Sequence, residues 1–166
     1  IDRIAMLTKE YRRISGTDSG RAETILSEIA VLCSYIKRRK HLTLLTDRDI
    51  KIPAAEIERA LNESLRTLGL LGVRSTLYVE NGLSMLSGRM AAAVFDFYES
   101  VIETDLEHLT SIQVSLADVD GLRLSMNVLC KADLSVFENK ENIICDKDED
   151  DGYQHIVFRA EGGALE

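Results

Sequence analysis

The sequence predicts an α+β protein in which a pair of N-terminal helices precedes helices that cover one face of a mixed β-sheet. Three observations predict this class. Apolar residues recur at helical spacing through the first 41 residues, alternating apolar and polar residues mark strands farther on, and the strands and helices do not alternate strictly along the chain. We expect a helical hairpin over residues 1–45 and an α/β sandwich over residues 46–166.

Two apolar stripes predict the hairpin, one of Ile4, Leu7, Tyr11 and Ile14 and one of Ile25, Ile29, Leu32 and Ile36. Turn and cap residues over 15–20 favour two helices over the alternative, one long helix with a weak middle. We expect the second helix to end in the basic tract over 37–41, because cations are favoured at a helix C-terminus. The tract is then either a solvated helix end or a binding patch.

After a linker over 42–52, we expect a helix from Pro53 that Gly69 and Gly72 terminate. Alternation predicts a strand over 73–80, and a long apolar stripe predicts a helix over 87–108. Further strands are expected over 111–117, 122–129, 142–145 and 153–159. A short helix is expected within 131–142, and the residues over 146–151 form an acidic loop.

Composition excludes several classes of protein. The 166 residues are 45% hydrophobic and 29% charged, unlike a disordered chain. The net charge of -8 argues against nucleic acid as a partner, because polyanions attract net positive surfaces. Three cysteines without zinc spacing (Cys33, Cys130 and Cys145) indicate buried thiols in a reducing compartment. No segment can span a bilayer, so we expect a cytoplasmic protein, or the cytoplasmic part of a membrane protein whose membrane segment lies upstream of Ile1.

Catalytic motifs such as GxGxxG, the P-loop, HExxH and GxSxG are absent from the sequence. The most unusual local feature is the pair Glu99 and Glu103, which lie one turn apart beside the apolar stripe of the helix expected over 87–108. Two such carboxylates can ligate a divalent cation or transfer a proton. The alternative is an ordinary charged helix flank.

Several stretches resemble a group of bacterial sensor histidine kinases. These are residues 29–42 with the sequence YIKRR, residues 52–57 and 62–65 at the domain entry, residues 94–99 at the start of the N box, and residues 151–153 with 162–163 in the last strand. The resemblance covers nearly the whole chain, and the YIKRR tract is its distinctive part. It implies a homodimer through the N-terminal helices and a Bergerat-type (histidine kinase ATPase-like) sandwich in two-component signal transduction, with a response regulator as partner.

The resemblance also implies ATP and Mg²⁺ as cofactors. It places the catalytic glutamate of the N box at Glu99, where it would help to activate a phosphoacceptor histidine. The magnesium-holding asparagine of the family falls at Glu103, which is thus the metal and cofactor position. The adenine-reading aspartate falls at Asp133, and the acceptor histidine falls at Ile1. We expect Glu99 to form part of one wall of an emptied nucleotide pocket between its helix and the sheet.

The sequence departs from the family at these positions. Glu103 adds negative charge where the family has a neutral amide, Leu106 and Glu107 replace two basic residues, and the glycines expected after Asp133 are missing. The acidic run over 146–151 stands roughly where the family has its glycine-rich lid, and it would repel phosphates. These departures favour a degenerate domain with weak or no catalysis.

Three hypotheses follow. The chain is a sensor histidine kinase fragment that still binds ATP weakly, or a kinase-derived dimeric scaffold that presents a surface to a signalling partner without nucleotide. The third is an unrelated α+β interaction domain without an active site.

Overall fold

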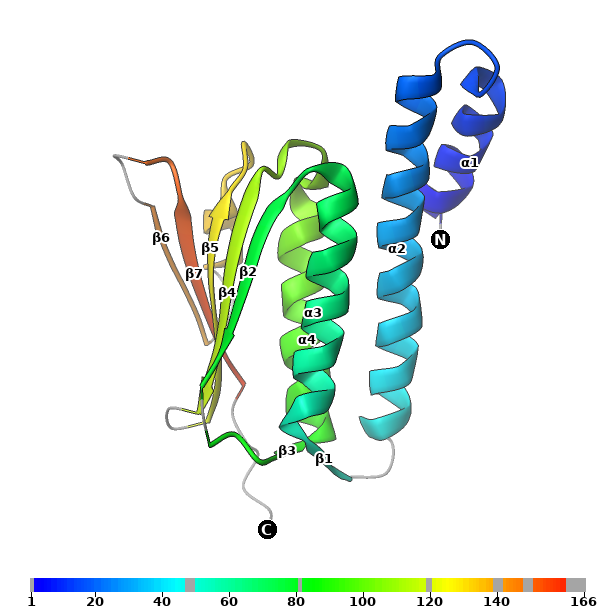
Figure 1. Ribbon diagram of the computed structural model, residues 1–166. Helices are drawn as coiled ribbons and strands as arrows, with labels where there is room; N and C mark the ends of the chain where they lie inside the picture. The colour runs from blue at the N-terminus through cyan, green and yellow to red at the C-terminus, as the bar shows by residue number, and fades with distance from the viewer. Residues whose placement is uncertain are drawn as a thin grey trace.

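Three layers build the protein, as the computed structural model shows (Figure 1). A five-stranded sheet forms the first layer, and helices α3 (Ala54–Leu68) and α4 (Gly88–Thr104) form the second. Helix α2 (Ser19–Thr46) packs against α3 and α4 on their side away from the sheet. Helix α1 (Asp2–Ile14) lies along the N-terminal half of α2. Helix α4 therefore lies between the sheet and α2.

The structure describes residues 2–46, 50–80, 82–118, 121–138, 142–147 and 151–160. Its strands are β1 (Lys51–Pro53), β2 (Arg74–Val79), β3 (Met85–Ser87), β4 (Ser111–Asp118), β5 (Leu122–Leu129), β6 (Ile143–Lys147) and β7 (Gln154–Ala160). Short 3₁₀ turns are η1 (Gly69–Leu71), η2 (Leu106–His108) and η3 (Leu134–Phe137). Ile1, residues 148–150 of the acidic run and residues 162–163 lie outside the described residues.

The main sheet is mixed, as predicted. Its strand order is β2-β4-β5-β7-β6; β2 runs parallel to β4, and the other neighbours are antiparallel. The predicted strands each appear within one or two residues of their expected bounds. The structure adds a two-stranded pair, β1 and β3, which the sequence did not predict. Each has only three residues, too few to show an alternating pattern.

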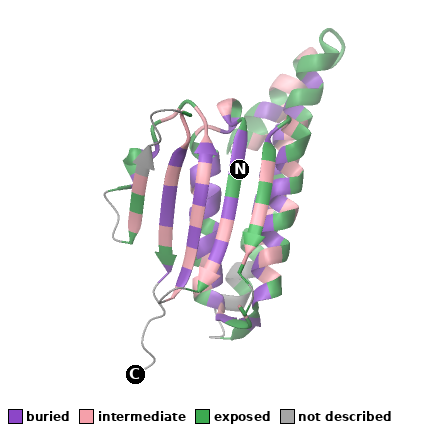
Figure 2. Cartoon of the chain, turned by 60° about the vertical axis from the view of Figure 1, so that its left-hand side comes forward, coloured by how far each residue is buried: buried purple, intermediate pink, exposed green. Residues whose placement is uncertain are grey.

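The two faces of the sheet differ in polarity. Along β5, Leu122, Leu124, Met126 and Val128 are buried against the helices, while the residues between them are half-buried. Figure 2 shows this alternation and a sheet face that no helix covers. On that face Asn127 Nδ2 donates to Gln113 Oε1 at 3.4 Å, and His155 Nδ1 lies 2.6 Å from Asn127 Oδ1. The core therefore lies between the sheet and the helices.

The predicted hairpin is confirmed, but the expected end of its second helix is wrong. Helix α2 continues to Thr46, so the basic tract lies inside the helix and the predicted linker starts five residues later. The physical reason is that the sequence has neither glycine nor proline between Gly20 and Pro53 to terminate the helix. At the other end Asp18 Oδ1 accepts a hydrogen bond from Arg21 N at 2.9 Å.

One hydrophobic core joins the helices and the sheet. It includes Ile25 and Val31 of α2 together with residues of α3, α4 and the strands, and the expected boundary between residues 45 and 46 falls at the C-terminus of α2. The expectation of buried thiols is wrong for Cys33, which is exposed, while Cys130 and Cys145 are half-buried. None of the described helices has the length and apolar character needed to cross a bilayer.

The turn between β4 and β5 depends on a glycine. Gly121 has a φ of +113°, and a Cβ atom there would lie 3.2 Å from Ala160 O. We expect Gly121→Ala to lower the free energy of unfolding by about 1–2 kcal/mol, because alanine is strained at positive φ. Gly16→Ala is the control, since a Cβ at Gly16 meets nothing within 4 Å. Urea denaturation measures both; equal effects would contradict the strain at Gly121.

Candidate functional site

Glu99 is a carboxyl group that the fold buries between two helices. Because α4 lies between the sheet and α2, both of its sides are covered, and most positions from Ala91 to Ile102 are buried. Glu99 belongs to this set, with 6% of its surface exposed. A charged residue type is rarely buried to this extent without a partner, so its surroundings decide what it can do.

Glu99 lines a pocket of about 640 Å³ between α2 and α4. The α2 wall consists of Tyr35, Ile36, Arg39, Lys40 and Leu44, and the α4 wall consists of Glu99 and Glu103. None of these lining residues belongs to the sheet. The expectation that Glu99 faces a pocket between its helix and the sheet is therefore wrong, because the pocket lies on the opposite side of α4.

Buried hydroxyl groups lie on the helices next to this carboxyl. Tyr98 Oη donates to Ser64 Oγ at 3.0 Å, which links α4 to α3. Tyr35 Oη is also buried and interacts with the Ser64 side chain, although not with the geometry of a full hydrogen bond. Burial raises the pKa of both tyrosines, so both remain protonated. Glu99 Oε1 is buried and has no partner with hydrogen-bond geometry among the described residues, and such an atom costs about 1–3 kcal/mol.

Burial also changes the protonation of Glu99. Burial and the nearby carboxylates of Glu103 and Asp96 raise the pKa of Glu99 to about 8, although Arg39 acts in the opposite direction. At neutral pH Glu99 therefore carries a proton and can donate as well as accept a hydrogen bond. A neutral carboxyl group is a poor ligand for Mg²⁺, which prefers carboxylate oxygens, but its pKa suits proton transfer near neutral pH.

The basic tract fixes α2 against the second layer. Arg38 forms an ion pair with Glu63 of α3, and Arg39 Nε lies 3.2 Å from Asp96 Oδ1 of α4. Both alternatives considered for the tract are therefore incomplete, because two of its residues make contacts within the chain. Exposed ion pairs contribute about 0–1 kcal/mol, so we interpret these pairs as orienting the helix rather than as its main source of stability.

The loop after β5, which carries Asp133, is held at several points. Gln154 Oε1 accepts from Leu134 N and Gln154 Nε2 donates to Ala132 O, both at 2.8 Å. Asp105 Oδ2 accepts from the backbone N–H groups of residues 131 and 132 at 2.7 Å. Asp133 Oδ1 accepts from Ser135 N at 3.0 Å and caps η3. Asp133 thus helps to fold its own loop.

Aromatic rings pack beside this loop. Phe97 of α4 stacks on Phe158 of β7 with ring centroids 4.7 Å apart, and it meets the edge of Phe137 of η3 at 5.6 Å. Leu134 is buried next to them in the same core. Apolar side chains therefore occupy the space between α4, the sheet and η3, next to the loop that the resemblance assigns to adenine.

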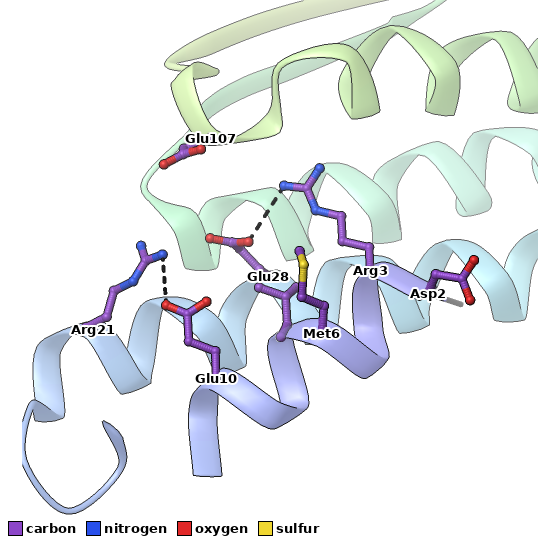
Figure 3. A pocket seen from close by; sticks show the side chains of 8 residues that line it. Asp2, Arg3, Met6, Glu10, Arg21, Glu28 and Glu107 are labelled. Atoms are coloured by element: carbon purple, nitrogen blue, oxygen red, sulfur yellow. Dashed lines mark hydrogen bonds and ion pairs between the residues drawn. The ribbon is translucent and has the colours of Figure 1, made fainter. Parts of the chain in front are cut away.

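A second pocket, of about 460 Å³, lies where α1, α2 and the end of α4 meet (Figure 3). Arg3 Nη2 lies 3.8 Å from Glu28 Oε2, and Arg21 Nη2 lies 3.4 Å from Glu10 Oε1. Glu107 approaches from η2. Ile1, the expected acceptor position, is outside the described residues, but Asp2 and Arg3 line this pocket. Among the residues that line this pocket, Glu28 is the one carboxyl group that is nearly buried, and it is paired with Arg3.

The three site residues predicted from the sequence lie in two different parts of the structure. Glu99 and Glu103 share the pocket between α2 and α4, whereas Asp133 is not among its lining residues. Within the part of the chain that the structure describes, no three potential ligands (His, Cys, Asp or Glu) lie close enough to hold a metal ion. The sequence reasoning missed Tyr35 and Arg39, which are one turn apart in α2, just as Glu99 and Glu103 are in α4.

The fold is similar to those of solved structures. The structure of a bacterial phosphotransferase matches 94% of this chain and 87% of its own, with a TM-score of 0.53 and 7% sequence identity. AdeS, a histidine kinase of Acinetobacter baumannii, matches over 96% of this chain and 94% of its own, with a TM-score of 0.47 and 9% identity. No protein-family model and no curated protein matches the sequence.

At such low identity, the similarity to the phosphotransferase is evidence of fold alone. The predicted class, an α+β chain with an N-terminal helical hairpin before an α/β sandwich on a mixed sheet, is confirmed.

The raised pKa of Glu99 makes a prediction about stability and pH. In the unfolded chain the carboxyl group ionises near pH 4.3, whereas in the folded protein it ionises near pH 8. Between these values the folded state holds an extra proton, so this group's stabilising contribution declines as pH rises and is lost above about pH 8. We expect Glu99→Gln to be about 1–2 kcal/mol more stable than the wild type at pH 8, with a smaller difference at pH 5.

Urea denaturation at several pH values measures this difference. Glu23→Gln, an exposed residue of the same protein on α2, is the matched control and should follow the wild type at every pH. A Glu99→Gln curve that runs parallel to the wild-type curve from pH 5 to pH 8 would show that Glu99 ionises normally.

The role of Gln154 in holding the Asp133 loop is also testable. Gln154→Leu removes the partners of a buried backbone N–H and of a carbonyl, so we expect the free energy of unfolding to fall by about 2–3 kcal/mol. Gln113→Leu, on the exposed face of β4, should change it by less than about 0.5 kcal/mol. If both variants are equally stable, the loop does not depend on Gln154.

Proposed function

We propose that this chain is a kinase-derived module of two-component signalling that acts as a dimeric scaffold and binds a signalling partner without nucleotide. The sequence resemblance to sensor histidine kinases suggests a kinase-derived module, and the similarity of the fold to a bacterial phosphotransferase is compatible with it. The observation that carries the proposal is the closed region beside Asp133, where fixed loop contacts and stacked rings stand in place of a glycine-rich adenine site.

Charge supports the loss of nucleotide binding. Glu103 lies one turn from Glu99 on the expected N-box helix, where the resemblance requires a neutral amide. The carboxylate of Glu103, within a chain of net charge -8, makes this face of α4 less attractive to a triphosphate than a neutral amide would. Glu99 itself faces α2, and at neutral pH it is protonated. The geometry therefore favours a scaffold over a kinase fragment that retains ATP.

The hairpin supplies the surface for dimerisation. Met6 on α1 is 63% exposed and Leu26 on α2 is 46% exposed. Exposed apolar residues on two neighbouring helices are the surface that a second hairpin can cover. The partner of the dimer would be a response regulator, which the resemblance implies.

The phosphotransferase activity named for the similar structure is not part of this proposal. A phosphotransfer step needs an acceptor histidine, and the three histidines of the sequence, His41, His108 and His155, all lie outside α1. We therefore assign no phosphotransfer step to the described residues.

Calorimetry and light scattering test the proposal. We expect no saturable heat with Mg²⁺-ATP at millimolar concentration, and a particle mass twice the 18.6 kDa of the chain. The double variant Met6→Glu, Leu26→Glu should be a folded monomer, because it places charges in the apolar contact. Leu70→Glu, equally exposed but on η1, should remain a dimer.

Either of two results would contradict the proposal. Saturable ATP binding at millimolar concentration or below would favour the kinase hypothesis, and a wild-type chain that is monomeric at all concentrations would remove the scaffold. Circular dichroism of the double variant separates loss of dimerisation from loss of folding.

A further inference from the structure

One buried polar atom without a partner belongs to a residue that lines the pocket. Glu99 Oε1 on α4 has no hydrogen-bond partner among the described residues, and Glu99 is 6% exposed. Tyr35, on the α2 side of the pocket, is 2% exposed, and its hydroxyl interacts with Ser64 of α3. Native structures rarely leave an atom such as Glu99 Oε1 unsatisfied, because it loses its water without replacement. The Glu99 carboxyl is therefore the group for which a polar ligand in the pocket would supply a partner.

The two walls of the pocket carry opposite charges. The α4 wall presents the carboxyl groups of Glu99 and Glu103, and the α2 wall presents the cations of Arg39 and Lys40. Arg39 also pairs with Asp96 beside the pocket. Lys40 is exposed and forms no ion pair with another described residue. The walls thus offer one acidic and one basic position to a ligand that spans them.

The rest of the pocket is apolar. Ile36 and Leu44 line it from α2, and Leu44 is 68% exposed. Leu44 lies one turn after Lys40 on the same helix, so the apolar surface continues from the basic position. A volume of about 640 Å³ is within the range of small-ligand sites.

We propose that the pocket between α2 and α4 binds a small zwitterion of the amino-acid type with an apolar side chain. The ammonium group contacts Glu99 and Glu103, the carboxylate contacts Lys40 and Arg39, and the side chain packs on Ile36 and Leu44. Binding of the ammonium group makes Glu99 release its proton to the solvent, because a positive charge at hydrogen-bond distance favours the carboxylate. The inference is independent of whether the chain binds nucleotide.

Three ligands of similar size separate this proposal from its alternatives. L-Leucine carries both charges, isoamylamine is leucine without the carboxylate, and 4-methylpentanoate is leucine without the ammonium group. We expect saturable binding of L-leucine at low millimolar concentration, and binding at least about tenfold weaker for each of the other two, since a charged hydrogen bond contributes about 1.5–3 kcal/mol. NMR should show shifts at the methyl groups of Ile36 and not of Ile144 on β6.

Variants then assign each contact. Glu99→Gln should weaken L-leucine and isoamylamine but not 4-methylpentanoate, and Lys40→Gln should weaken L-leucine and 4-methylpentanoate but not isoamylamine. Neither variant is expected to unfold, because the first removes a buried acid and the second removes an exposed cation. Glu23→Gln and Lys37→Gln, which change exposed residues of α2 outside the pocket, are the matched controls.

Several outcomes would overturn the proposal. If L-leucine gives no saturable binding up to about 20 mM, the unpaired oxygen of Glu99 is satisfied by water alone. If isoamylamine binds as tightly as L-leucine, the pocket is a cation site. If 4-methylpentanoate binds as tightly as L-leucine, the pocket is an anion site. Binding that Glu99→Gln leaves unchanged would place the ligand elsewhere.

Discussion

The packing of α2 against α4 is the constraint on which the rest of the structure depends. It covers the side of α4 that the sheet leaves open, and so it buries a carboxyl group that would otherwise be an ordinary charged residue on a helix flank. Burial then raises the pKa of Glu99, leaves one of its oxygens without a partner and creates the pocket that Arg39 and Lys40 complete. Two ion pairs orient α2 in this packing. Arg38 pairs with Glu63 of α3, and Arg39 pairs with Asp96 of α4.

This packing places Glu99 on the opposite side of its helix from the site that the resemblance implied. The helix that the resemblance identifies as the N box keeps its glutamate, but Glu99 faces α2 rather than the sheet. On the side of α4 that faces the sheet, Phe97 and its two neighbouring rings fill the core, and Gln154 fixes the loop that carries Asp133. Apolar packing contributes to stability over the whole area it buries, so a site for adenine there would require part of the core to open.

Much of the fold follows from local patterns in the sequence, whereas the site does not. The alternation in β4 and β5 predicted both strands, and the apolar stripe of α4 predicted that helix. The predicted end of α2 was wrong because the sequence has no glycine or proline there to terminate the helix. Strands β1 and β3 were missed because they are too short to show an alternating pattern. The sequence also placed Glu99 and Glu103 on one helix face, since that depends only on spacing. It did not show which layer covers that face, because the pocket that Glu99 shares with Tyr35 joins residues 64 positions apart in the chain. Likewise, Asp133 was predicted from its position after a strand, but its role in capping η3 depends on the final path of the loop.

The ionisation of Glu99 is the most direct measure of this account. Carbon-13 NMR of the glutamate carboxyl groups, followed from pH 4 to pH 10 and assigned with Glu99→Gln, reports that ionisation without any ligand or partner. The account predicts one carboxyl group that titrates near pH 8 and disappears in the variant. If every glutamate signal titrates below about pH 5.5, Glu99 is exposed to water, and the packing of α2 on α4 is not the arrangement described here.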